Sequence, residues 1–192
     1  MTLLPLCSTI INSTFFRLNV NILFLTGMVV LCVTSTFWTT EVTACLQAAS
    51  EGDATAVSNY AAQLTKQLFV VVEMVRGKLT KLQRKTISAL VTLDVHARDV
   101  TQGLADDNIS KVDDFDWLSQ MRYYWTPGGK SATTGMPGSV ICRMINAERQ
   151  YAYEYLGNSS RLVITPLTGK YSSKRAAREW STVVVVIVIF IS

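Results

Sequence analysis

Three consecutive residues in a glycine-rich stretch come closest to a nucleotide-binding motif. Gly129, Lys130 and Ser131 have the order of the last three residues of a phosphate-binding loop, in which glycine amides surround phosphates and the lysine reaches the outer ones. The first glycine of that motif is missing, because Tyr124 stands five residues before Gly129. No buried strand is predicted before this segment and no helix after it, so the sequence predicts no phosphate-binding loop here.

A second group of residues could in principle transfer protons. On a helix, Asp94 and Arg98 lie four residues apart and would form an ion pair, while His96 has Asp99 three residues away. Without a nucleophile nearby, a structural histidine is far commoner than a catalytic one. Glu154 stands among three tyrosines without a second carboxylate at a workable distance, so it is predicted to be a solvated strand position. We therefore predict no catalytic residue.

The cysteines do not have the spacing of a metal site. Cys7, Cys32, Cys45 and Cys142 include no CxxC pair, and His96 stands far from them. We predict free thiols and no bound metal. The formal charge of +4, from 18 basic and 14 acidic residues, is too small to indicate a nucleic-acid partner.

Charge and hydropathy divide the 192 residues into a charged middle and two apolar ends. Before Glu41 the only charged side chain is Arg17, and after Glu179 there is none. Residues 1–37 form an apolar segment in which Val20–Trp38 is near the about 20 residues needed to cross a bilayer. It carries no Lys/Arg cluster that would orient it, so we interpret residues 1–37 as membrane-anchor-like or as not native to the fold.

The middle of the chain has the periodicity of helices. Glu41–Ser50 is compatible with a short helix, and residues 51–53 are typical of a turn. Apolar residues then recur at spacings of three and four through 54–76 and again through 78–104, on either side of Gly77. Two such helices could form an antiparallel pair or a kinked rod.

The segment after residue 106 predicts a further short helix. Asp113 or Asp114 is a plausible N-cap for a helix over Phe115–Tyr124. The residues expected to be buried there are Phe115, Leu118 and Trp125. We expect Arg122 to stack on the aromatic residues that follow it, or to extend its charged end past them to solvent.

Strand signals follow a loop. Residues 126–139 are rich in Gly, Pro, Ser and Thr, which predicts a flexible loop, and Val140–Ile145 predicts a strand. Within Tyr151–Thr168, three tyrosines alternate with Ala152 and Glu154 before a Gly-Asn turn and an apolar run, which indicates a hairpin.

Three segments also resemble a known family. The sequences LVTLDVHARDV at 90–100, FDWLSQMRYYW at 115–125 and EYLGNSSRLVITPLT at 154–168 are similar to axonemal dynein heavy chains, most nearly of the inner-arm type. The resemblance covers roughly Trp38 to Thr168. It implies an α+β fragment: the helical C-terminal part of the linker at 38–125, a flexible loop at 126–139, and the first short strands of an incomplete AAA+ module at 140–168. Residues 169–192 form a divergent apolar tail.

The resemblance also implies a nucleotide contact. In dyneins, the segment similar to 162–168 lies beside the adenine of the first AAA+ site. The residues that would contact ATP here are Leu162, Val163, Ile164, Thr165, Pro166 and Leu167. The Walker A lysine, the Walker B acid, the sensors and the arginine finger have no counterpart in the sequence, so this chain is expected not to hydrolyse ATP alone. Ala152 replaces a usual glycine, the 126–139 loop looks longer than the family's, and the family's continuation after Thr168 is lost.

The implied function is that of a fragment of an ATP-driven, minus-end-directed microtubule motor. Its implied cofactor is ATP with Mg in the intact motor. Its implied partners are the rest of the motor ring and, through the full-length protein, the microtubule and the dynein intermediate and light chains, in the cytoplasm, the cytoskeleton and the axoneme of cilia and flagella. Nucleic acid and membrane are not expected partners.

Two alternatives of other classes stay open. One is a small membrane-anchored helical protein, which carbonate-resistant membrane association or a glycan at Asn108 or Asn158 would support. The other is a non-enzymatic helical interaction module, which would bind a partner without nucleotide dependence.

Overall fold

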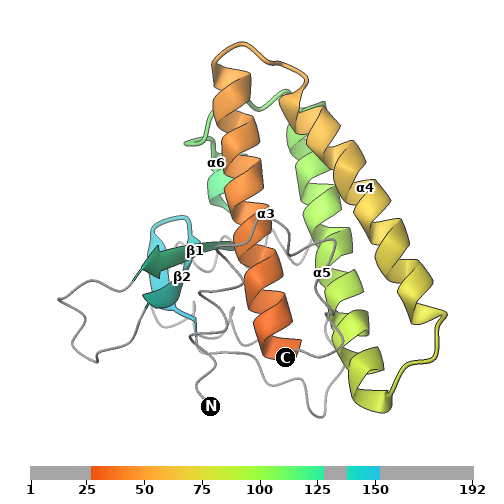
Figure 1. The fold of residues 1–192 in the computed structure, drawn as a ribbon. Helices are drawn as coiled ribbons and strands as arrows, with labels where there is room; N and C mark the ends of the chain where they lie inside the picture. Colours follow the sequence, from red (N-terminus) through yellow and green to blue (C-terminus); the bar gives the residue numbers. More distant parts are fainter. Residues whose placement is uncertain (1–26, 128–137, 152–192) are drawn as a thin grey trace.

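Helices dominate the fold, and a small sheet lies against one of them (Figure 1). The computed structural model describes residues 27–127 and 138–151. The helices are α3 (Gly27–Ser50), α4 (Ala56–Val75), α5 (Lys81–Asp106) and α6 (Phe115–Leu118). The strands are β1 (Arg122–Pro127), β2 (Gly138–Met144) and β3 (Ala147–Gln150), which form an antiparallel sheet in the order β1-β2-β3. The predicted α+β class is confirmed.

Helices α4 and α5 form the antiparallel pair that was one of the two predicted arrangements (Figure 1). Their apolar spacing gave bounds within a few residues of those observed. Helix α5 begins with a capping box: the Thr80 side chain accepts a hydrogen bond from the backbone N–H of Gln83, and the Gln83 side chain accepts from that of Thr80. The buried residues of α4 are Val57, Tyr60, Ala61, Leu64, Leu68 and Val71.

Helix α3 is much longer than the short helix expected over Glu41–Ser50, because it begins at Gly27 and continues through Trp38. Val30 and Leu31 pack in a cluster with residues of α4 and α5, and Cys32 packs in a second cluster with residues of the sheet. Burial against several elements stabilises a helix here although β-branched residues have modest helix propensity.

The hydroxyls of four threonines of α3 form hydrogen bonds within the helix. Thr36, Thr39, Thr40 and Thr43 each donate to the backbone carbonyl four residues earlier, at 2.7–2.9 Å. By length and apolar composition α3 could cross a membrane, and 56% of its apolar window is buried inside the protein. Core helices of soluble proteins meet the same criteria.

The prediction of a helix over Phe115–Tyr124 is wrong after Leu118. Asp114 does cap α6, and its side chain accepts from the Asp116 N–H at 3.0 Å. From Arg122 onward, however, the chain is strand β1, whose Tyr123 and Trp125 are paired with residues of β2. Aromatic residues favour a strand wherever a partner strand is available.

Burial around α6 also differs from the expectation. Phe115 is 61% exposed, whereas Trp117, which was not among the predicted buried residues, is completely buried. Leu118 and Trp125 are only partly buried. A helix of four residues buries one narrow side, and here that side carries Trp117.

Strands β1 and β2 form a hairpin, which was not predicted because residues up to Tyr124 were expected to be helical. The strand expected over Val140–Ile145 begins at Gly138, and Thr126 and Pro127, assigned to the loop, belong to β1. In the register, Thr126 is opposite Ser139 and Pro127 is opposite Gly138. The paired strands therefore leave only the interval 128–137, which lies outside the described residues, for the connection.

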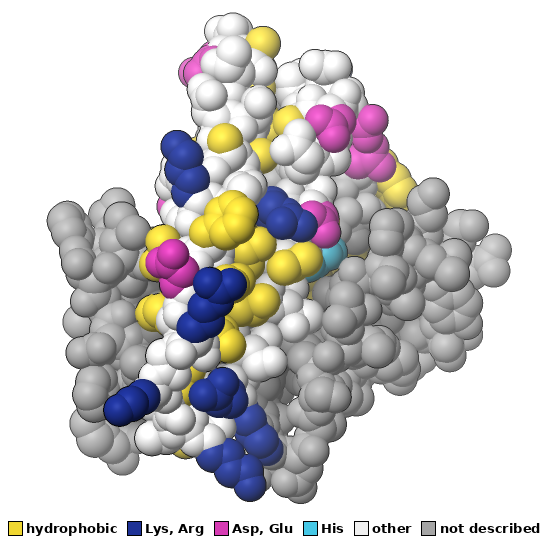
Figure 2. All heavy atoms as spheres, turned by 90° about the vertical axis from the view of Figure 1, so that its right-hand side faces the viewer, with side chains coloured by type: hydrophobic (Ala, Val, Ile, Leu, Met, Phe, Trp, Pro, Cys, Tyr) yellow, Lys and Arg dark blue, Asp and Glu magenta, His cyan; other side chains and the backbone are white. Residues whose placement is uncertain are grey.

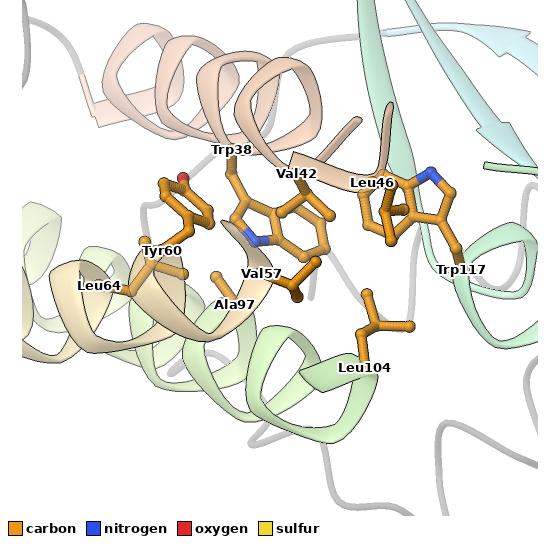
Figure 3. Close-up of a cluster of buried hydrophobic side chains, with 9 residues drawn as sticks. All are labelled: Trp38, Val42, Leu46, Val57, Tyr60, Leu64, Ala97, Leu104 and Trp117. Carbon is orange, nitrogen blue, oxygen red and sulfur yellow. The ribbon is translucent and has the colours of Figure 1, made fainter. Parts of the chain in front are cut away.

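Among the described residues, the largest cluster of buried side chains lies where helices α3, α4, α5 and α6 meet (Figure 3). Its members are Trp38, Val42 and Leu46 from α3, Val57, Tyr60 and Leu64 from α4, Ala97 and Leu104 from α5, and Trp117 from α6. Because every helix contributes, the bundle and the segment leading into the sheet share one core.

Candidate functional site

The residues predicted to contact adenine, Leu162–Leu167, lie outside the described residues, as do Gly129–Ser131 and Glu154. Their predicted roles stay predictions. Within the described ranges, no group of three His, Cys, Asp or Glu side chains is placed to hold a metal ion. Cys32, Cys45 and Cys142 are not part of a disulfide.

The residues considered above for proton transfer, Asp94, His96, Arg98 and Asp99, lie on α5. Arg98 and Asp99 form a partly exposed ion pair at 2.6 Å, with two hydrogen bonds from the guanidinium to the same carboxylate oxygen. His96 and Asp94 are half-buried on the same helix. An exposed ion pair between neighbours stabilises a helix only slightly.

The feature with the most specific buried contacts is the junction between α3 and strand β1. Thr39 is completely buried, and its Oγ1 accepts a hydrogen bond from the backbone N–H of Tyr123 at 2.9 Å. The same hydroxyl donates to the Ser35 carbonyl in the helix. One threonine thus links two segments that are 84 residues apart in sequence, and neither its type nor its spacing signalled this role.

Aromatic side chains extend this junction into the bundle. The Trp38 and Trp117 rings meet edge to face, with centroids 5.4 Å apart and planes at 71°. The Trp38 Nε1 donates to Thr101 Oγ1 at 3.2 Å, and Thr101 donates to the Ala97 carbonyl at 2.7 Å. Figure 3 shows both rings within the same cluster, with Leu46 beside Trp117. Helices α3, α5 and α6 are therefore joined by specific contacts as well as by apolar burial.

Arg122, the first residue of β1, is nearly buried against these aromatic rings. It is 6% exposed, and its guanidinium carbon lies 6.0 Å from the Trp117 ring centroid and 5.8 Å from that of Tyr124. It donates to the Tyr124 hydroxyl at 3.0 Å. The predicted stacking of Arg122 on aromatic residues is confirmed.

Two donors in this region have no acceptor among the described residues. They are the Arg122 Nε and the Trp117 Nε1, both of which are buried. On the next strand, Arg143 lies 5.0 Å from the Tyr124 ring centroid and is paired with Glu148 at 2.7 Å. The junction thus buries one cation against aromatic faces and holds a second at its margin, an arrangement suited to holding two elements together.

Near the C-terminal end of α3, the thiol of Cys45 has a shifted pKa. Burial raises the pKa of the Cys45 thiol above its ordinary value, and the nearby carboxylates of Glu41 and Asp53 raise it further. Glu41 also accepts a hydrogen bond from the Tyr60 hydroxyl. A thiol with a raised pKa is a poor nucleophile at neutral pH.

Known proteins contain closely similar sequence. The chain is 46% identical over 144 residues to dynein axonemal heavy chain 1 and dynein axonemal heavy chain 12 of Rattus norvegicus, and to dynein axonemal heavy chain 3 of Mus musculus. No protein-family model matches. The matched residues are 75% of this chain but only 3–4% of each relative, so the chain spans a small part of the relatives' length.

The matched length also exceeds the 131 residues from Trp38 to Thr168, so the similarity continues past at least one of these positions. Identity at this level over 144 residues, in several relatives of one kind, is far above what composition alone produces. Over these residues, the chain belongs to the family of axonemal dynein heavy chains.

Proposed function

We propose that this chain is the region of an axonemal dynein heavy chain in which the helical linker passes into the first AAA+ module. Its role is to connect the two mechanically within an ATP-driven, minus-end-directed microtubule motor of cilia and flagella. The similarity to axonemal dynein heavy chains supports the family. The buried contacts between helices and sheet support the mechanical role.

The observation that carries the proposal is the buried hydrogen bond from the Tyr123 N–H to Thr39 Oγ1. A connection transmits a displacement only if the two elements move together. Around this bond, Cys32 of α3 packs with Tyr123, Val140 and Cys142 of the sheet. Pulling the sheet away from α3 would expose these side chains and leave a buried amide without an acceptor, which costs about 1–3 kcal/mol for the amide alone.

ATP enters the proposal through the residues predicted to contact adenine, Leu162–Leu167. In the proposed motor, Mg-ATP binds where this segment meets the remainder of the ring. The same proposal gives the chain the motor ring, the microtubule and the dynein intermediate and light chains as partners, in the axoneme. By itself the 192-residue chain is expected not to turn over ATP. Phosphate release above a buffer blank in a magnesium-supplemented assay would contradict this.

The mechanical role can be tested in a chimaera. In an axonemal dynein heavy chain whose matched segment is replaced by that of this chain, Thr39→Val removes the acceptor for the Tyr123 N–H at nearly constant volume. Microtubule gliding is expected to slow while nucleotide binding to the ring is retained. Thr43→Val is the matched control, because Thr43 donates only to the Thr39 carbonyl within α3.

Equal gliding velocities of the two variants would contradict the proposed role. Loss of nucleotide binding in Thr39→Val alone would also contradict it, because the damage would then extend beyond the connection. A circular dichroism melt of each variant separates a loosened junction from global unfolding.

One observation favours a second candidate, a membrane-anchored helical protein: α3 is long and apolar enough to cross a bilayer. Against it, Val30, Leu31 and Cys32 of α3 are buried in clusters with α4, α5 and the sheet. Extraction of the expressed chain from membranes with alkaline carbonate decides between the two. Resistance to extraction would support the membrane anchor.

A further inference from the structure

The α4–α5 connection carries a run of positive charge without any negative charge. Between Glu73 and Asp94 the sequence has no acidic residue. The basic residues of this interval are Arg76, Lys78, Lys81, Arg84 and Lys85. They occupy the end of α4, the connection and the first two turns of α5. We call Arg76, Lys78, Lys81 and Arg84 the basic tip.

The basic tip is exposed, and most of its charge is not neutralised. All four side chains are exposed. Within the described part of the chain, no ion pair engages Arg76, Lys78 or Lys81, and Arg84 donates to the Val75 carbonyl at 3.4 Å. Figure 2 shows Lys and Arg side chains gathered over the lower part of the face formed by α4 and α5.

This charge works against the helix that carries it. The N-terminus of a helix has a partial positive charge and favours acidic residues in its first turn. Helix α5 has none there and instead begins with Lys81, with Arg84 three residues later. The capping box of Thr80 and Gln83 offsets part of this cost. Arg76, at the C-terminus of α4, and Arg84, which donates to the Val75 carbonyl there, favour the end of that helix. Helix stability gives no such reason for Lys78 and Lys81, whereas an anionic partner does.

Exposed apolar side chains accompany the charges. Leu82, beside Lys81, is 71% exposed, and Phe69 of α4 is 67% exposed. Phe69 precedes Arg76 by seven residues, two helical turns, so the two share one face of α4. Val70 beside Phe69 is also exposed. A partner of this surface must offer both carboxylates and apolar side chains.

The mixture of these groups on one face favours a polypeptide over a lipid surface. A helix that lies on a membrane buries an apolar stripe and keeps its cations on the opposite, polar face. Here Phe69 and Arg76 share one face of α4, and Figure 2 shows Lys and Arg side chains both beside and below the hydrophobic side chains of this face. A peptide that carries acidic and apolar side chains on the same face matches this mixture.

The remaining residues of the chain are poor candidates for the occupant. Residues 1–26, 128–137 and 152–192 together contain only two acidic residues, Glu154 and Glu179, among seven basic ones. Charge complementarity therefore points to a segment from outside this chain. We propose that the basic tip, with Leu82 and Phe69, is a docking surface for an acidic, amphipathic polypeptide segment that is not among these 192 residues.

The test uses the complete 192-residue chain and a fluorescein-labelled peptide of glutamate with leucine at every third position. Binding is followed by fluorescence anisotropy. Lys78→Gln with Lys81→Gln is expected to weaken binding about tenfold, since tenfold corresponds to about 1.4 kcal/mol, or two exposed charge contacts. Leu82→Gln is expected to weaken it as well, because the apolar part of the peptide loses a contact.

The matched control is Lys111→Gln with Arg149→Gln, which removes the same charge from exposed positions outside the docking surface. This control is expected to keep the wild-type affinity. Equal weakening by both double variants would overturn the proposal, because attraction by net charge would then explain the binding.

Two further outcomes would also overturn it. Vesicles of phosphatidylserine that displace the peptide and lose their binding in the same double variant would assign the surface to membranes. Self-association in sedimentation, lost in the same variant, would assign it to a second copy of the chain. Circular dichroism of each variant confirms that the helices are retained.

Discussion

Trp38 and Trp117 touch in the core, yet their indole nitrogens differ. The Trp38 Nε1 donates to Thr101, whereas the Trp117 Nε1 has no acceptor among the described residues. Both rings are nearly or completely buried and meet edge to face. The apolar contribution of the two residues is therefore similar, and the hydrogen bond is the main difference.

Replacing each tryptophan by phenylalanine separates these contributions. Trp38→Phe loses packing and the bond to Thr101, while Trp117→Phe loses packing alone and removes a buried donor without an acceptor. The free energy of unfolding is expected to fall about 1 kcal/mol further for Trp38→Phe. Urea denaturation of both variants measures this, and equal losses would contradict it.

Cys45 gives a prediction that depends on pH. Its pKa is raised first by burial and then by Glu41 and Asp53, so the folded protein holds the thiol proton to higher pH than an unfolded chain does. At pH 8, iodoacetamide is therefore expected to modify Cys45 more slowly than a cysteine in a short peptide. Mass spectrometry of the Cys45 peptide gives the rate. Glu41→Gln should increase the rate, and an unchanged or lower rate would argue against the carboxylate's contribution.

At the scale of elements, the β1–β2 hairpin depends on the glycine that begins β2. Gly138 has φ +151°, and a Cβ there would lie 2.5 Å from the Trp125 ring and 3.0 Å from the Thr126 carbonyl oxygen. Trp125 and Thr126 belong to the paired strand. The close approach of the two strands at this end therefore requires glycine.

Gly138→Ala is expected to destabilise the protein by about 2 kcal/mol, through strained backbone and displacement of Trp125. Gly103→Ala is the matched control. Gly103 is inside helix α5, and nothing lies within 4 Å of the position of its missing Cβ. Because alanine favours a helix, this control is expected to gain about 0.5–1 kcal/mol. Thermal melts of the two variants should shift in opposite directions, and a shift in the same direction would be evidence against the role of glycine at position 138.

At the scale of the whole molecule, the described helices and sheet share buried contacts through α3. Its Val42 lies in the cluster common to the four helices, and its Cys32 lies in the cluster that contains Tyr123. The bond from the Tyr123 N–H to Thr39 falls between the two. The structure therefore predicts that the bundle and the sheet open together.

Hydrogen exchange followed by NMR tests this cooperativity. The amides of Tyr123 and Val42 are expected to exchange at similar, slow rates, because both need the same opening. In Thr39→Val, the Tyr123 amide is expected to exchange faster while that of Val42 changes little. A Tyr123 amide that exchanges orders of magnitude faster than Val42 in the unaltered protein would mean that the sheet opens by itself.

The sequence by itself determined the helices and strands that bury only one face and whose ends are marked by nearby residues. The three- and four-residue spacing located α4 and α5, and β-prone residues indicated β2. The start of α6 was predicted at Asp113 or Asp114, and Asp114 is the residue that caps it. Three sequence segments were also sufficient to identify the axonemal dynein family, because several long similar segments in a fixed order are specific without any knowledge of the fold. The residues predicted to contact adenine, Leu162–Leu167, rest on that resemblance alone.

Only the tertiary structure decided the remaining features. Helix α3 is buried against several elements, so its N-terminal half has no apolar period from which its start at Gly27 could be predicted. The change from helix to strand at Arg122 depends on β2, which a local pattern does not contain. The contact between Thr39 and Tyr123 joins positions 84 residues apart, and only folding brings these two polar groups together in the buried interior.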